Sequence, residues 1–292
     1  MSGTSPPPEP PAAVLPHRRG PRLPAPTLYN MSLGMIVVLA MAAIFAPVIA
    51  PYDPLYQDIL ARLKGPSAAH WLGTDQFGRD VLSRILFGLR SSLMISGGAV
   101  FAAFLAGSLL GLTAAYYKGW ADRIIMRLMD VLFAFPVMLL AIGVIALLGP
   151  GATPTATAIG IVYTPIFARL LRGPALVVAE SDYVLNARAI GASDARIIFL
   201  HILPNLVSVI LVQFSLLLSS AILVEASLSF LGLGTQPPVP SLGMMLSEGR
   251  GFLFLAPWAA VFSGFAILIV AFALNLFGDA LRDELDPRLR QA

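Results

Sequence analysis

The stretch NARAIGASDARIIFLHILPN, Asn186 to Asn205, lies between two long apolar runs and belongs to neither of them. It combines alanines, several charged residues, a glycine near its middle and a proline where the next apolar run begins. Ser181 and Asp182 are good residues for a helix N-terminus, and Gly191 can enter the left-handed region that often ends a helix. This pattern predicts a short helix followed by a glycine turn.

A second helix is expected after that turn. Ser193 can cap it, Asp194 is favourable in its first turn, and its apolar residues continue to Leu203. Pro204 suits the first turn of the following apolar helix. Residues 181–204 therefore predict a helical hairpin that leads directly into the next apolar run.

Apolar runs of about 20 residues, the length that a membrane-spanning helix needs, recur along the chain on both sides of this hairpin. The 292 residues are 57% hydrophobic and only 12% charged, whereas an ordinary soluble domain has about 25% charged residues. Because a lipid-exposed segment has to satisfy its own backbone hydrogen bonds, each run predicts a helix. The predicted spans cover residues 28–50, 92–115, 131–149, 155–171, 204–231 and 257–278. The sequence thus predicts an all-α integral membrane protein with six transmembrane helices.

The basic residues predict how these spans are oriented. Counted by alternate sides of the membrane, thirteen Lys and Arg residues fall on the side of both termini and of the hairpin, and six fall on the opposite side. Positively charged loops are retained in the cytoplasm, so both termini and the hairpin are expected there. Seventeen of the nineteen basic residues are Arg, as is typical of a GC-rich bacterial genome. We therefore expect a multi-pass protein of a bacterial cytoplasmic (plasma) membrane.

The chain is expected to divide into four segments. Residues 1–27 contain nine prolines and few apolar residues, which predicts a disordered cytosolic tail. Residues 28–90 are expected to hold the first transmembrane helix and an extracytoplasmic segment. Residues 91–282 are expected to form the core transmembrane domain, which includes the cytoplasmic hairpin, and residues 283–292 a cytosolic C-terminal tail.

The extracytoplasmic segment ends in an amphipathic pattern from Arg79 to Ser91. Its apolar residues share one helical face, with Asp80 and Arg84 opposite, where they are spaced to form an i,i+4 ion pair. Such a helix is expected to lie along the membrane surface. The alternative is an amphipathic lead-in to the second span without a binding role.

Several kinds of site are excluded or given no support by the composition. The chain has no cysteine, so it can form neither a disulfide nor a thiolate metal site. Its two lysines, Lys64 and Lys118, lie in RLKGP and YYKGW, so there is no Gly-Lys-Ser/Thr phosphate-binding loop. The three histidines, at positions 17, 70 and 201, are far apart and have no ligand-like spacing. We expect no cofactor on this chain, and any ATP would be bound with Mg²⁺ by another polypeptide.

A hairpin on the cytoplasmic face of a membrane protein without its own nucleotide site is suited to receive force from a partner. The small residues Ala187, Ala189 and Gly191 would let a partner surface approach closely. The apolar side chains of Ile190, Ile197 and Ile198 could anchor that partner. The alternative is a loop that merely links the fourth and fifth spans.

The hairpin resembles the EAA loop of ATP-binding cassette (ABC) import permeases, in which EAA, three residues, Gly, nine residues and I-x-L-P form the helix that docks on the ATPase subunit. Gly191 matches the glycine, Ala187 the second alanine, and Leu203 with Pro204 the terminal pair. The sequence departs from the pattern at three positions, which are Leu185 in place of Glu, Asn186 in place of the first Ala, and His201 in place of Ile.

Other stretches resemble the C-type permease of dipeptide, oligopeptide and nickel importers over roughly residues 30–290. They are HWLGTDQFGRDVLSRILFGLRSSL, MRLMDVLFAFP, EASLSFLGLGTQPP, PSLGMMLSEGR and LNLFGDALRDELDPRLR. The resemblance implies the binding-protein-dependent (type I) ABC importer permease fold. It also implies a heterodimer with a B-type permease, two cytoplasmic ABC ATPase subunits or one fused ATPase, and an extracytoplasmic substrate-binding protein. The expected substrate is a peptide, with a nickel chelate as the alternative, and no nucleic-acid partner is expected.

Candidate functional residues follow from these observations. The ATPase-coupling candidates are Ala187, Arg188, Ala189, Ile190, Gly191, Asp194, Ile198, Leu203 and Pro204. Asp75, Arg79 and Asp80 lie in the extracytoplasmic segment, where they either help a binding protein to dock or form a structural ion-pair cluster. At the cytoplasmic edge of the third span, Asp130 is expected to be a solvated charge near Arg123 or Arg127.

Glu225 is the carboxylate that lies deepest in an apolar run. A charged group within a span is costly, so it normally faces a cavity or a partner. Glu225 is expected near the outer end of the fifth span, where it either bonds to a neighbouring helix or loop, gates the pathway, or contacts the amino group of a peptide. A secondary transporter or channel is the rival function, but no internal repeat supports it. An intramembrane enzyme would need a nucleophile or metal constellation inside the spans, and the sequence shows none.

Overall fold

The computed structural model describes residues 25–285, and this part of the chain is helical, with one isolated bridge between Thr74 and Asp80 and no β-strand. Single turns of 3₁₀-helix lie at Ile59–Ala61 and Leu203–Leu206, and a π-helical turn lies at Ile197–Ile202. The α-helices are α1 (Ala25–Ile44), α2 (Ala46–Ile49), α3 (Val81–Tyr117), α4 (Gly119–Phe133), α5 (Val137–Leu148), α6 (Ala152–Ala179), α7 (Asp182–Ala189), α8 (Asp194–Arg196), α9 (Val207–Phe230), α10 (Leu242–Arg250) and α11 (Pro257–Leu285). The all-α prediction is confirmed.

Most of the predicted spans correspond to long apolar helices. Within the described residues, four helices are long and apolar enough to cross a membrane: Val81–Tyr117, Ala152–Ala179, Asp194–Phe230 and Pro257–Leu285. The first predicted span corresponds to a shorter apolar helix, Leu28–Ile44, followed by a break at Phe45 and the short α2. Residues 1–24 and 286–292, which hold most of both predicted tails, lie outside the described residues, whereas residues 25–27 and 283–285 belong to α1 and α11.

The third predicted span, residues 131–149, is not one straight helix. Helices α4 and α5 meet at an angle of 93°, and they pass the length and hydropathy test for a span only as a pair. Pro136 causes the break, since a proline has no backbone N–H to donate and keeps the preceding residue out of the helical conformation. The chain therefore turns sharply at FAFP before α5 begins.

Helix α3 runs without interruption for 37 residues from Val81 to Tyr117. The Asp80 side chain caps its first turn by accepting a hydrogen bond of 2.9 Å from the backbone N–H of Ser83. The predicted amphipathic segment is thus the first part of α3, a lead-in to the second span, and not a separate helix on the membrane surface. At about 1.5 Å per residue, α3 is about 55 Å long and extends beyond the roughly 30 Å of bilayer hydrocarbon.

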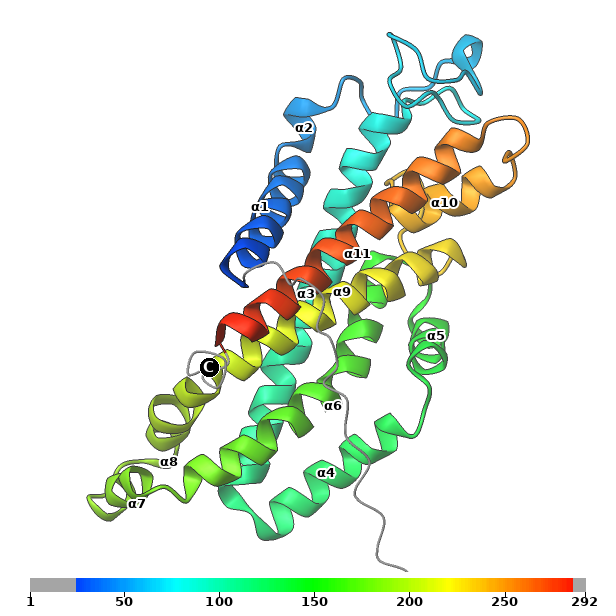
Figure 1. The fold of residues 1–292 in the computed structure, drawn as a ribbon. Coiled ribbons are helices and arrows are strands. Elements are labelled where there is room, and N and C mark those ends of the chain that lie inside the picture. Colours follow the sequence, from blue (N-terminus) through cyan, green and yellow to red (C-terminus); the bar gives the residue numbers. More distant parts are fainter. Residues whose placement is uncertain (1–24, 286–292) are drawn as a thin grey trace, which may run out of the picture.

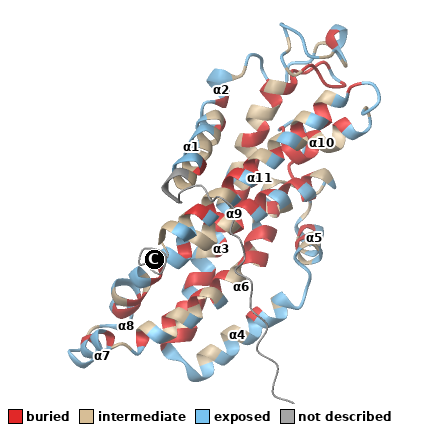
Figure 2. Cartoon of the chain, in the orientation of Figure 1, coloured by how far each residue is buried: buried red, intermediate tan, exposed pale blue. Residues whose placement is uncertain are grey.

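The centre of the bundle is the contact between α3 and α6, which is the most extensive helix pair in the described chain. Gly107 and Gly111 of α3 make it possible, because a Cβ atom at either position would overlap the backbone of Thr164 or Ala168 on α6. Small residues at such positions are how membrane helices approach closely. Buried residues, coloured red in Figure 2, recur along both helices.

The remaining helices surround that pair. Helix α11 packs along α9 and α1, and α10 packs against α9 and α11. Figure 1 shows α7 and α8 at one end of the bundle, here called the hairpin end, and α10 with residues 51–80 at the opposite end, here called the α10 end. The two groups of predicted site residues therefore lie at opposite ends of the molecule.

Candidate functional site

The hairpin turn forms around Gly191 as the sequence predicts. Gly191 has a φ of +84°, in the left-handed region that favours glycine. The Ala192 N–H donates to the Ala187 carbonyl at 3.0 Å, and the Gly191 N–H donates to the Arg188 carbonyl at 3.0 Å. Nothing lies within 4 Å of the position a Cβ would take at Gly191, so the backbone conformation and not crowding requires a glycine.

The second helix of the hairpin is less regular than expected. It begins as α8 after Ser193, changes to the π-helical and 3₁₀ turns, and continues into α9, so that Asp194–Phe230 forms one long apolar helix. Pro204 lies within this irregular part, where its missing N–H interrupts the regular hydrogen-bond ladder. The Asn205 Nδ2 donates to the His201 carbonyl at 2.6 Å and to the Tyr183 hydroxyl at 3.0 Å, which ties α7 to the start of α9.

The inner face of the hairpin packs against the rest of the chain. Four hairpin side chains are buried in one hydrophobic cluster: Val184, Ile197, Ile198 and Ile202. Residues from the C-terminal halves of α3 and α6, among them Leu112, Leu171 and Ala175, complete the cluster. Ile197 and Ile198 are therefore not available to anchor a partner, which corrects the prediction for both. Ala187 is also buried, at 8% exposed, so it does not offer the small outer surface that was predicted for it.

The outer face of the hairpin is free within this chain. Ile190 is 86% exposed at the tip, beside Ala189 and Gly191, which are also exposed. Leu185, at the position where the EAA pattern has Glu, is 46% exposed. The remaining predicted coupling residues divide between exposed Arg188, Asp194 and Pro204 and half-buried Leu203. The apolar tip is the part of the hairpin that a partner protein can reach.

The end of α3 holds the hairpin in place through two tyrosines. The Tyr116 hydroxyl donates to Oδ1 of Asp194 at 2.7 Å, and the Tyr117 hydroxyl donates to Oδ2 at 3.0 Å. The Arg188 guanidinium lies 4.9 Å from the centroid of the Tyr116 ring. Asp194 and Arg188 thus position the hairpin on α3. Sequence reasoning did not select the tyrosines, because they are more than 70 residues away and follow no recognisable motif.

Ion pairs join α3, α4 and α6 near the hairpin end. Arg172 of α6 makes a bidentate pair with Asp122 of α4, at 2.5 and 2.6 Å. Asp130 pairs with Arg169 of α6, and not with Arg123 or Arg127, near which it was expected to lie. After the end of α3, the Lys118 ammonium contacts Glu180 at 2.6 Å and holds the pKa of that carboxyl below its usual value.

At the α10 end, Asp75, Arg79 and Arg84 form a buried charge cluster with Glu248 of α10. Arg79 contacts Asp75 at 2.7 Å and Glu248 at 3.1 Å, while Arg84 contacts Glu248 at 3.0 Å and also pairs with Asp75. The cluster ties residues 51–80 to α10. Asp75 and Arg79 were candidates for binding-protein docking, but their exposed fractions are only 2% and 6%. Of the two alternatives, these side chains fit the structural ion-pair cluster.

Asp80, the third docking candidate, is 3% exposed and has different partners from those expected. Its carboxylate caps α3 and contacts His70 Nδ1 at 3.0 Å, so the predicted i,i+4 pair with Arg84 does not form. Because the helix begins immediately after Asp80, its side chain turns back onto the first turn of α3. Arg84 points instead to Asp75 and Glu248.

Glu225 is fully buried on α9, five residues before the helix ends. Its Oε1 accepts a hydrogen bond of 2.7 Å from the Ser229 hydroxyl in the next turn. Its Oε2 is buried without a hydrogen-bond partner, and the same is true of the Ser92 and Ser96 hydroxyls on α3. Glu225 thus lies near the end of α9 as expected, hydrogen-bonded to Ser229 of its own helix and with Ser92 of the neighbouring α3 close enough to interact with its carboxylate.

No group of three or more His, Cys, Asp or Glu side chains within residues 25–285 is arranged to hold a metal ion.

Two family models match the chain. The model of the binding-protein-dependent transport system inner membrane component matches residues 103–291, which includes the hairpin. The model of the N-terminal TM domain of oligopeptide transport permease C matches residues 30–66.

Relatives with known names match over most of their length. The glutathione transport system permease protein GsiD of Pectobacterium atrosepticum is 49% identical over 262 residues, which is 89% of this chain and 87% of that protein. The dipeptide transport system permease protein DppC of Alkalihalophilus pseudofirmus is 45% identical over 260 residues, 88% of this chain and 86% of that protein. GsiD of Escherichia coli O6:K15:H31 is 50% identical over 256 residues, 87% of this chain and 84% of that protein.

Two solved structures share the fold. One is the MetNI methionine ABC transporter in an inward-facing conformation, with a TM-score of 0.55, 16% identity and coverage of 70% of this chain and 96% of that chain. The other is an amino acid ABC transporter with histidines, with a TM-score of 0.51, 15% identity and coverage of 70% and 95%. Together with the family matches, they confirm the type I ABC importer permease fold. The chain belongs to the family of binding-protein-dependent transport system inner membrane components, the membrane-spanning permease subunits of bacterial ABC importers.

Proposed function

We propose that this permease forms half of the translocation pathway of a peptide importer and is driven by ATPase subunits that dock on the hairpin. The observation that carries the proposal is the hairpin itself, whose apolar tip at Ile190 is exposed while its inner face is built into the core. An exposed apolar side chain beside small residues suits a partner surface that approaches closely. The ATPases would be two cytoplasmic subunits or one fused polypeptide, and they would hold the ATP and Mg²⁺.

The hairpin has three physical connections through which a push on its tip would reach the membrane helices. The bonds from Asp194 to Tyr116 and Tyr117 lead to α3. The buried cluster around Ile197 leads to α6, and the unbroken path from Asp194 to Phe230 leads to α9. ATP binding would thus rock all three helices together and convert the pathway from inward-open to outward-open. Hydrolysis would reset it, and no covalent chemistry would take place on this chain.

The proposed orientation puts the hairpin end and both termini in the cytoplasm. The excess of basic residues on that side supports it. The α10 end, with residues 51–80, would then face the extracytoplasmic binding protein that delivers the substrate. The buried charge cluster would support the shape of that face, while the exposed backbone and side chains around it would provide the contact.

A B-type permease would complete the pathway as the other half of a heterodimer. The substrate would be a peptide, because relatives with 45% to 50% identity are named as glutathione and dipeptide transport permeases. A nickel chelate is the alternative substrate, and it would be taken up by the same machinery.

The test is uptake into proteoliposomes that contain this chain with the permease, ATPases and binding protein encoded beside it. Labelled glutathione, dipeptides, longer peptides and a nickel chelate are offered separately, with and without ATP inside the vesicles. ATP-dependent uptake of a peptide is the expected result. Uptake that does not require ATP would contradict the proposal in favour of a secondary transporter. ATP-dependent uptake of the nickel chelate alone would show that the substrate is a nickel chelate and not a peptide.

A further inference from the structure

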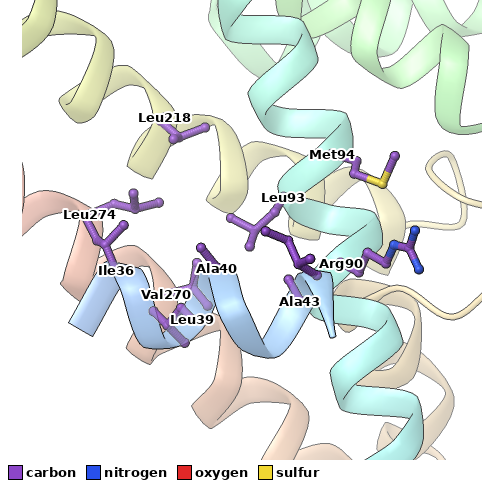
Figure 3. Close-up of a pocket in the computed structure, with 11 residues that line it drawn as sticks. Ile36, Leu39, Ala40, Ala43, Arg90, Leu93, Met94, Leu218, Val270 and Leu274 are labelled. Carbon is purple, nitrogen blue, oxygen red and sulfur yellow. The ribbon is translucent and has the colours of Figure 1, made fainter. Parts of the chain in front are cut away.

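A groove of about 460 Å³ lies where α1 meets α3, α9 and α11 (Figure 3). Ten of its eleven lining residues are apolar, and Arg90 of α3 is the exception. Ile36 and Leu39 come from α1, Leu93 from α3, and Val270 and Leu274 from α11. The groove thus combines side chains from the first and last long helices of the described chain.

One side of the groove is open. Two of its lining residues, Ile44 of α1 and Met94 of α3, are 63% and 67% exposed, so they mark the side on which the groove meets its surroundings. The helices that form it belong to a membrane permease, and the surroundings of such helices are hydrocarbon chains. A groove of this composition is therefore suited to an acyl chain.

Arg90 lies at one end of the groove, and its guanidinium extends past the apolar side chains (Figure 3). Unlike Arg79, Arg84, Arg169 and Arg172, it has no ion pair or hydrogen bond to any residue that the structure describes. An arginine whose stem lines an apolar surface while its charge reaches a polar layer is a common arrangement at membrane interfaces. The charge at this end of the groove has no protein counterion within residues 25–285.

The depth of Arg90 matches the boundary of the bilayer. Arg90 lies nine residues after Val81, which is about 14 Å along α3. A helix of about 55 Å that is centred on about 30 Å of hydrocarbon extends about 12 Å beyond it at each end. With this placement the Arg90 backbone lies at the edge of the hydrocarbon on the α10 side, from where its long side chain can reach the lipid phosphates, while Leu93 and the rest of the groove lie at the depth of the acyl chains.

We propose that this groove binds an anionic phospholipid, with one acyl chain against α1, α3 and α11 and the phosphate against Arg90. The unpaired charge of Arg90 selects the headgroup, since a lipid with net negative charge supplies the missing counterion. The bound lipid completes the packing between α1 and the bundle. This site is independent of the transported substrate and of ATPase docking.

Lipid retention tests the site directly. The full-length chain is purified in detergent with its partner subunits, and bound phospholipid is measured by native mass spectrometry after exchange into mixtures of phosphatidylglycerol and phosphatidylethanolamine. Wild-type protein is expected to retain phosphatidylglycerol preferentially. Arg90→Gln is expected to retain about fivefold less, as loss of one basic contact to an anionic lipid surface predicts. Arg127→Gln, which removes an exposed arginine of α4, is the matched control and is expected to retain as much as wild type.

A second variant and a labelling experiment separate the site from general effects of charge. Ala40→Phe fills the groove without removing the cation, so it is expected to lower lipid retention as well. Because the chain has no native cysteine, Met94→Cys can be coupled to a photoreactive group at one defined position. Adducts with phosphatidylglycerol support the proposal. Three results would overturn the proposal. They are wild-type lipid retention by both groove variants, retention without preference for phosphatidylglycerol, and adducts with another protein subunit in place of lipid. None of these measurements requires transport, so they remain informative if the proposed function fails.

Discussion

The hydroxyl of Tyr116, the penultimate residue of α3, donates a hydrogen bond of 2.7 Å to Asp194, which is the first residue of α8. The bond joins two segments that are 78 residues apart in the sequence. It places the hairpin on the end of α3, whose length of about 55 Å exceeds the roughly 30 Å of bilayer hydrocarbon. The hairpin is therefore attached to the bundle at more points than its two chain connections provide.

The double substitution Tyr116→Phe with Tyr117→Phe should separate ATP hydrolysis from transport. It removes both hydroxyls that hold Asp194 but leaves the buried cluster and the exposed tip unchanged. We expect ATPase subunits to co-purify at wild-type levels, while peptide uptake per ATP hydrolysed falls several-fold. The ratio of the peptide uptake rate to the ATP hydrolysis rate in proteoliposomes measures this change. Tyr29→Phe, in α1 and outside the hairpin, serves as the control, and an unchanged ratio in the double variant would show that α3 is not driven through Asp194.

Gly191→Leu should weaken ATPase docking without affecting membrane insertion. A leucine is strained at a φ of +84°, by about 1–2 kcal/mol for the left-handed region, and would shift the turn that presents Ile190. Gly191→Asn is the matched control, because Asn tolerates this conformation better than other side chains. We expect the amount of co-purified ATPase and the uptake rate to fall in the Leu variant and to be largely kept in the Asn variant. Equal loss in both variants would mean that the exposed glycine surface, and not the turn geometry, is what the partner requires.

Asp75→Asn should destabilise the α10 end. The substitution leaves the buried guanidinium groups of Arg79 and Arg84 with Glu248 as their remaining anionic partner. Breaking a buried ion pair on one side typically costs about 3–5 kcal/mol. We expect a clear fall in the midpoint of thermal unfolding in detergent, whereas Asp53→Asn, at an exposed aspartate of the same segment, should change it little. Equal midpoints for the two variants would show that the cluster does not stabilise this end.

Glu225 should tolerate the loss of its charge but not of its hydrogen-bond partner. Glu225→Gln keeps an acceptor for Ser229, and its amide supplies donors toward a region where buried hydroxyls of α3 lack partners. Ser229→Ala removes the hydrogen bond that the buried Oε1 accepts and is expected to cost about 1–3 kcal/mol of stability. Thermal unfolding and peptide uptake are measured for both variants. A Glu225→Gln protein with wild-type unfolding and more than about tenfold slower uptake would assign Glu225 to the pathway or its gate.

Local signals predicted the helices and the hairpin turn well. The apolar runs specify where helices lie because a backbone in hydrocarbon has no other way to satisfy its polar groups. The turn at Gly191 was predictable for a similar reason, since a glycine after a short helical segment is the usual way to enter the left-handed conformation. Pro136 was also visible in the sequence, and its position inside an apolar run is why the straight third span was wrong.

Partners distant in sequence were the part that local reasoning could not supply. Asp130 was assigned to the nearest arginines, yet it pairs with Arg169, because α4 crosses α6 and brings that residue to it. Asp75 and Arg79 were predicted either to help a binding protein to dock or to form a structural ion-pair cluster, and the choice depended on Glu248 of α10, more than 160 residues away. Asp80 was paired by helical spacing with Arg84, but capping the helix took priority once α3 began at Val81. In the first two cases the tertiary packing of helices decided the contact, and in the third the position at which the helix begins decided it.

The continuity of α3 has a mechanical consequence. One end of this helix is fixed to the hairpin through Tyr116, and the other end carries Arg84 in the cluster that holds α10. A stiff rod of about 55 Å that tilts by about 5° moves its far end by about 5 Å, nearly the rise of one helical turn. The helix would thus act as a lever, amplifying a small displacement at the ATPase side into a movement large enough to reshape the opposite mouth of the transporter.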